Sequence, residues 1–179
     1  MSLLSRLFDS SGRRAASLAR EIVGASHAAR LQFLELNKGE EAPGADAELL
    51  FAFCIACTHM VDRVAQATMG ERATVFVAQV WSEVVAILVA HGTAGQPDGA
   101  LGSVIRKSMN DSFTVSQAVF WRAEWESGTK LVPGSVQYVL GERVALAVIP
   151  KPAPKTINLG AILVVECLNA IRIPDKLPR

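Results

Sequence analysis

Apolar residues recur with helical spacing along most of the chain, and glycine- or proline-containing stretches separate these segments. Positions three and four residues apart fall on one face of a helix, so this spacing predicts amphipathic helices. We place them at 13–37, 46–69, 71–91, 98–127 (with a possible break near Asn110), 134–148 and 156–172. The fold class predicted is therefore all-α, a single-domain bundle of five to seven helices that spans residues 1–179.

Helix ends are marked by residue types that suit them. The expected N-caps are polar side chains that can accept from the first free N–H groups, and the expected C′ residues are glycines. These are Asp46, Asp98 and Thr156 at helix starts, and Gly70, Gly92 and Gly128 at helix ends. Ser10 to Gly12 is expected to interrupt a short N-terminal turn, and residues 150–155 alternate proline with lysine or alanine as an extended connector before the last helix.

Residues 136–149 fit two structures. Val136, Tyr138 and Leu140 alternate with polar or smaller residues, as in a β-hairpin strand. The same stretch also gives a helical stripe of apolar positions. We favour the helix because the rest of the chain is helical, with the hairpin near 136–149 as the alternative.

Two helices, 71–91 and 156–172, are apolar around most of their circumference. A surface helix of a monomer needs an apolar stripe only a little over ~100° wide. We therefore predict a homodimer in which one of these faces meets a second copy. The alternative is a monomer that encloses both helices. Glu83 at the centre of the first argues against a membrane span, because a carboxylate there costs roughly 2.5–3.5 kcal/mol.

Composition narrows the function classes. The 179 residues are 50% apolar and 20% charged, with a net charge of +1. Such a chain is neither disordered nor basic enough to bind nucleic acid through phosphate neutralisation. Three cysteines argue against a secreted disulfide scaffold, so we expect a cytoplasmic protein. The arginines and serines of residues 1–20 would also suit a transit peptide, but an amphipathic first helix is preferred.

The densest polar group on any predicted helix consists of His59, Asp62 and Arg63. A histidine oriented by a carboxylate is a recurrent part of acid–base and binding sites. We name these three residues as the candidate ligand-binding site. Glu83 or Glu166 could face them across the bundle, and the alternative is a solvated helix face or a structural polar network.

Cys54 and Cys57 have the spacing of a metal half-site, but no second half-site accompanies them. They lie in the middle of an apolar helix, which favours buried thiols that act as small apolar side chains. Haem ligation by His59 and His91 is a weaker alternative. We expect no cofactor.

Trp121 and Trp125 are four residues apart and would form one aromatic ridge on a helix, a candidate partner-binding surface. Nucleotide-binding loops and nucleophile elbows are absent from the sequence. The function favoured is a non-enzymatic helical protein that acts through homodimerisation or contact with another protein. The alternative is a helical bundle that binds a small ligand, a metal or haem, with weak enzymatic activity at most.

Overall fold

The computed structural model describes residues 3–38, 45–94, 97, 99–124, 132–173 and 177, with backbone alone for residues 3–10. Within these residues it contains six α-helices and no strand, so the all-α prediction is confirmed. The helices are α1 (Leu3–Leu36), α2 (Ala45–Met69), α3 (Arg72–Gly92), α4 (Ala100–Arg122), α5 (Val136–Leu146) and α6 (Pro154–Ile171).

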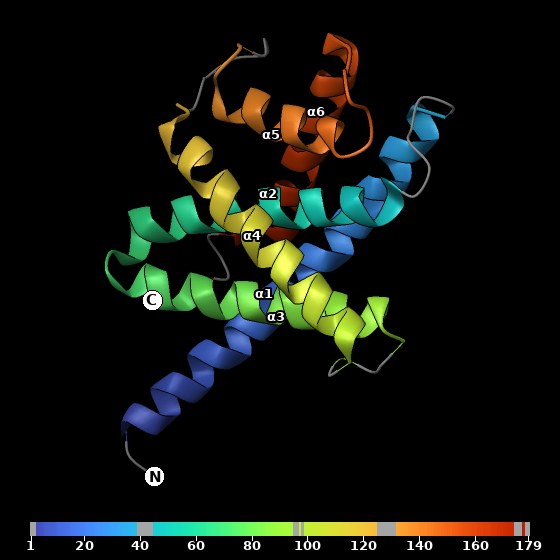
Figure 1. Ribbon diagram of the computed structural model, residues 1–179. Coiled ribbons are helices and arrows are strands. Elements are labelled where there is room, and N and C mark those ends of the chain that lie inside the picture. Colours follow the sequence, from blue (N-terminus) through green and yellow to red (C-terminus); the bar gives the residue numbers. More distant parts are fainter. Residues whose placement is uncertain are drawn as a thin grey trace.

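Helix α2 lies between two groups of helices, α3 with α4 and α5 with α6. In Figure 1, α2 and α3 run side by side and α4 crosses both of them obliquely, while α5 and α6 pair at one end of the bundle. The long α1 contacts α2, α3 and α6. Buried apolar side chains from all six helices form one continuous core. The site described below lies where α4 crosses α2.

Several helix boundaries differ from the sequence-based prediction. The first helix begins at Leu3 and continues through Ser10 to Gly12, because an isolated glycine costs a helix only about 1 kcal/mol. The fourth helix is unbroken at Asn110 and ends at Arg122 rather than 127. Residues 136–146 are helical, so the hairpin alternative is wrong; Ser135 caps α5 by accepting from the N–H of Tyr138.

The predicted caps fare unevenly. Gly70 has φ +59° at the end of α2, as a C′ glycine should. Gly92 still lies within α3, and Ala94 takes the positive φ instead. The last helix begins at Pro154 rather than at 156, because proline suits the first turn of a helix, so Thr156 is not the N-cap. The earlier start of α6 also shortens the predicted 150–155 connector.

Asp46 lies inside the first turn of α2, which begins at Ala45. The predicted cap Asp98 and the predicted C′ residue Gly128 lie outside the described residues.

The two apolar helices are α3 and α6, and both are long and apolar enough to cross a membrane. The core helix of a soluble fold meets the same criterion, and both helices pack against several neighbours here. Each leaves one large apolar side chain exposed, Val75 at 58% and Ile162 at 53%. Most of the excess apolar surface is therefore buried within one copy of the chain.

Candidate functional site

His59, Asp62 and Arg63 lie on the face of α2 that α4 covers, so they do not form a solvated surface. His59 is 1% exposed and Asp62 is 4% exposed. The three side chains diverge within the interface. His59 faces a cavity toward α5, Asp62 faces a second cavity toward α3, and Arg63 turns to the end of α4. The structure therefore buries His59 and Asp62 and directs them to different cavities, while Arg63 lines neither.

His59 is held between two aromatic rings of α4. Its imidazole stacks on Phe113 with centroids 4.4 Å apart and on Phe120 with centroids 5.0 Å apart. Phe113 and Phe120 are seven residues apart, which advances a helix by about 10.5 Å and leaves room for one ring between them. Trp81 of α3 extends the stack, with its ring 4.3 Å from that of Phe113. Stacked rings from three helices thus fix the position of α4.

The hydrogen bonds of His59 define its tautomer. Ser116 uses its only hydroxyl proton to donate to the carbonyl of Phe113 at 2.9 Å. The Nε2 of His59, 2.7 Å from the Ser116 hydroxyl oxygen, is therefore the donor in that pair. Its Nδ1 is buried without a hydrogen-bond partner in the described structure. Burial lowers the pKa of His59 to about 4, so the imidazole is neutral at pH 7.

Arg63 ends α4. Its guanidinium donates to the carbonyl of Ala123 at 2.8 Å and to that of Phe120 at 3.4 Å. It also lies 5.8 Å from the centroids of the Phe120 and Trp121 rings. A cation at a helix C-terminus satisfies carbonyls that have no partner within the helix. Arg63 thus acts inside the fold and lines neither cavity.

The helix predicted to carry Trp121 and Trp125 to residue 127 ends at Arg122, and Ala123 is extended. The carbonyl of Glu124 accepts from the N–H of Val136, which draws the chain toward α5. Trp121 is 42% exposed, and Trp125 lies outside the described residues.

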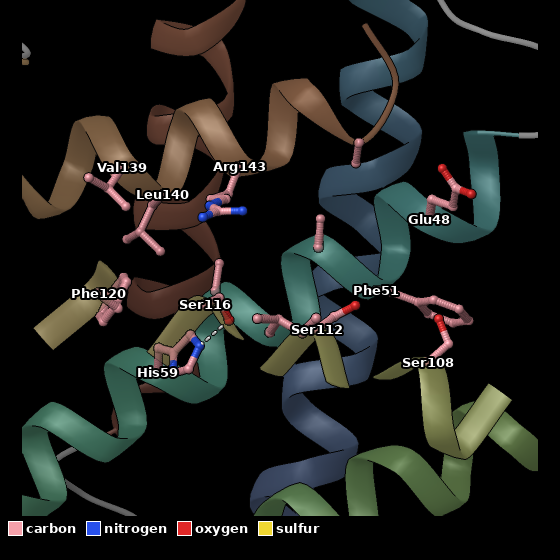
Figure 2. Close-up of a pocket in the computed structure, with 14 residues that line it drawn as sticks. Glu48, Phe51, His59, Ser108, Ser112, Ser116, Phe120, Val139, Leu140 and Arg143 are labelled. Carbon is pink, nitrogen blue, oxygen red and sulfur yellow. Dashed lines mark hydrogen bonds between the residues drawn. The ribbon is translucent and has the colours of Figure 1, made fainter. Parts of the chain in front are cut away.

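A cavity of about 290 Å³ opens between α2, α4 and α5. Figure 2 shows His59, Ser116 and Phe120 at one end of it, and Glu48, Phe51 and Ser108 at the other. Arg143 projects from α5 toward the space between the two ends. The lining residues are Glu48, Phe51, Ala52, Ile55, Ala56, His59, Ser108, Ser112, Ser116, Phe120, Val139, Leu140, Arg143 and Ala147.

This cavity combines an apolar body with polar groups that have no partner among the described residues. Ser108, Ser112 and Ser116 place one hydroxyl on each turn of the α4 wall. The first two make no hydrogen bond with any residue that the structure describes, and the Arg143 guanidinium makes neither a hydrogen bond nor an ion pair there. A mainly apolar pocket with a few convergent polar groups is typical of small-molecule sites.

Three residues of the sequence could have indicated that this part of α2 is covered. Phe51, Ala52 and Ile55 are apolar positions within the polar face of α2 near its start, and in the structure all three line the cavity. The serine row and Arg143 were not among the predicted site residues, although a four-residue spacing of serines on one helix is readable in the sequence. Glu83 and Glu166 are exposed and line neither cavity.

The three cysteines come together in the core between α1, α2 and α6. Burial raises the pKa of the Cys54 thiol to about 12. A hydrogen bond with Cys167, together with burial, raises the pKa of Cys57 as well. Protonated, fully buried thiols are poor nucleophiles and poor metal ligands. Among the described residues no three His, Cys, Asp or Glu side chains are placed to hold a metal ion.

The arrangement is therefore suited to binding. The imidazole of His59 is neutral and sandwiched between rings, and its one hydrogen-bonded nitrogen is committed to Ser116. His91, the other residue considered for haem, is exposed at the end of α3. Comparison of the chain with protein families, with curated proteins and with solved structures gives no match.

Proposed function

We propose that this chain is a small-molecule-binding helical protein whose ligand occupies the cavity between α2, α4 and α5. The observation that carries the proposal is the exposed Arg143 guanidinium beside a mainly apolar cavity, where it has no hydrogen bond or ion pair with any described residue. An unpaired arginine at such a site favours an acidic group, because the guanidinium binds carboxylates in a bidentate manner. The ligand class that fits is a small amphipathic carboxylate.

The remaining groups set the orientation of that ligand. Ser112 can donate a hydroxyl proton to the bound acid, and Phe51 and Ile55 supply apolar contacts for its body. Glu48 lies at the end near Phe51 and repels a second negative charge there. The cavity of about 290 Å³ lies at the lower limit of ordinary ligand pockets, roughly 300–1,000 Å³, so the ligand is small.

Titration of ¹⁵N-labelled protein with octanoate tests the proposal. Octanoate should shift amide signals of residues around the cavity in a saturable way, and octanol should bind more weakly. Arg143→Met should weaken octanoate binding about tenfold or more, because a hydrogen bond to a charged group contributes about 1.5–3 kcal/mol. Arg20→Met is the matched control, since Arg20 is an exposed arginine of α1 that does not line the cavity.

A second variant tests the cavity itself and leaves the charge of Arg143 in place. Ala52→Leu places extra methyl groups into the cavity from α2 and should abolish octanoate binding while the helix content is unchanged. Equal binding by wild type, Arg143→Met and Ala52→Leu would refute the proposal, as would the absence of any saturable shift.

A second candidate function is self-association through α4. Four large apolar side chains on one face of α4 are 40–65% exposed, more than on any other helix within the described residues: Leu101, Val104, Val115 and Val119. Exposed apolar surface of this extent is typical of contact surfaces. We propose that a homodimer, if formed, uses this face rather than α3 or α6. Light scattering after size exclusion should then show a dimer that Val104→Lys with Val115→Lys converts to monomer; a monomeric wild type at high concentration would exclude it.

A further inference from the structure

A second cavity, of about 410 Å³, lies between α2, α3 and α4. Asp62 lines this cavity, and His59 does not. Its walls include the rings of Trp81, Phe113 and Trp121, with Gln117 among the polar residues. Trp81 and Phe113 belong to the stack that fixes α4. This cavity shares no lining residue with the cavity of the proposed carboxylate site.

Asp62 is a buried carboxylate without a counter-ion among the residues that the structure describes. The residue is 4% exposed, and its one hydrogen bond with a described residue is a long contact of 3.4 Å from the amide of Gln66. No lysine or arginine approaches it within ion-pair distance in the described part of the chain. Arg63, its neighbour in sequence, is engaged by the carbonyls of Phe120 and Ala123. Buried charges in proteins are ordinarily paired, so this carboxylate lacks the partner that its burial calls for.

The aromatic walls indicate the chemistry of the missing partner. The faces of aromatic rings attract cations, and aromatic residues beside a carboxylate are a recurrent way to bind alkylated ammonium groups. Both faces of Phe113 are covered, one by His59 and the other by Trp81, so the faces available to a cation are those of the two tryptophans. Trp121 already accepts a cation in this structure, because the Arg63 guanidinium carbon lies 5.8 Å from its ring centroid. None of the described residues that line the cavity is basic.

We propose that the cavity between α2, α3 and α4 binds a small organic ammonium ion, with the Asp62 carboxylate as its counter-ion and the rings of Trp81, Phe113 and Trp121 as its walls. An inorganic cation would leave the aromatic walls unused. The apolar rings favour an ion that carries methyl or methylene groups on its nitrogen. This site is independent of the carboxylate site and does not depend on the function proposed for it.

The test follows the indole N–H signal of Trp81 by ¹H–¹⁵N NMR at constant ionic strength. This proton donates to the side-chain carbonyl of Asn110 at 2.8 Å, so it is a defined probe at the cavity. Tetramethylammonium chloride should shift the signal in a saturable way. Sodium chloride and tert-butanol, which lack either the methyl groups or the charge, should not.

Variants assign the effect to the site. Asp62→Asn preserves shape and should weaken tetramethylammonium binding at least tenfold, whereas Asp111→Asn, at an exposed carboxylate of α4, should not change it. Trp121→Leu, at a position that is 42% exposed, should weaken tetramethylammonium binding severalfold even if Asp62→Asn fails to fold. Arg143→Met should leave tetramethylammonium binding unchanged. Equal shifts by sodium or tert-butanol, unchanged binding in Asp62→Asn or Trp121→Leu, or no saturable shift would overturn the proposal.

Discussion

Two helix crossings in this protein are built in opposite ways. Where α5 meets α6, Gly141 lies against Gly160 and the backbones touch: a methyl group on Gly141 would lie 2.7 Å from the backbone nitrogen of Ala161 and closer still to the carbonyl oxygen of Ile157. Where α4 crosses α2 and α3, rings separate the helices. Only Gly102, Met109 and Phe120 of α4 are buried.

The difference explains where the cavities lie. Backbone contact between glycines leaves no space between α5 and α6. Spacing by stacked rings holds α4 at a greater distance, and the space beside the stack on either side becomes a cavity. Protein interiors are otherwise packed as densely as organic crystals, so two cavities beside one helix are a local exception. The candidate binding chemistry is concentrated along α4 for this reason.

The largest effect is expected at the glycine crossing. Gly141→Val should destabilise the protein by about 4 kcal/mol, because its new atoms meet backbone of α6 that cannot move aside. Urea unfolding followed by circular dichroism measures the change. Gly24→Ala is the control, since nothing lies within 4 Å of the added methyl group in α1. It should stabilise the protein by about 0.5–1 kcal/mol. A small loss in Gly141→Val would show that the two crossings are equally adaptable.

The ring-spaced crossing should be sensitive to acid in a way that the glycine crossing is not. The pKa of His59 is about 4 in the folded protein and about 6.5 when unfolded, so the unfolded chain binds more protons between these values. Stability should therefore be complete above about pH 6.5 and fall as the pH is lowered. The expected loss is about 2 kcal/mol between pH 7 and pH 5 and about 3 kcal/mol by pH 4.

His59→Phe isolates this contribution, because a third phenyl ring fits the stack and does not titrate. Urea unfolding of both proteins at pH 7 and pH 5 measures the difference in slope. The wild type should lose about 2 kcal/mol more than His59→Phe over this interval. Equal slopes would mean that the imidazole accepts a proton without leaving the stack.

The same contrast shows what the sequence could predict. Helices α2, α3, α5 and α6 follow from apolar spacing and from glycine and proline positions, because these act locally. The covering of His59, Asp62 and Arg63 by α4 could not be predicted from the sequence around them. It depends on which helix covers the polar face of α2, and Phe113 and Phe120 that cover it are more than fifty residues away in sequence.

The C-terminal end of α4 is a second feature that the local sequence pattern does not predict. The apolar pattern extends to about residue 127, but the helix stops at Arg122. Arg63 binds the carbonyls of Phe120 and Ala123, and Val136 donates to Glu124. Partners distant in sequence therefore set this boundary.

The smallest effect should come from single hydroxyls along α4. Ser116→Ala removes the acceptor of the His59 Nε2 proton and leaves a buried donor unsatisfied, which costs about 1–3 kcal/mol. Ser112→Ala, one turn earlier on the same wall, removes a hydroxyl without a described partner and should change stability by no more than about 0.5 kcal/mol. Thermal and urea unfolding of the two variants compare them directly. If both lose the same stability, the serine row acts as helix surface and His59 is held by its rings alone. If only Ser116→Ala is destabilised, Ser112 is free for a ligand, and the crossing is fixed by one hydrogen bond and the stack around it.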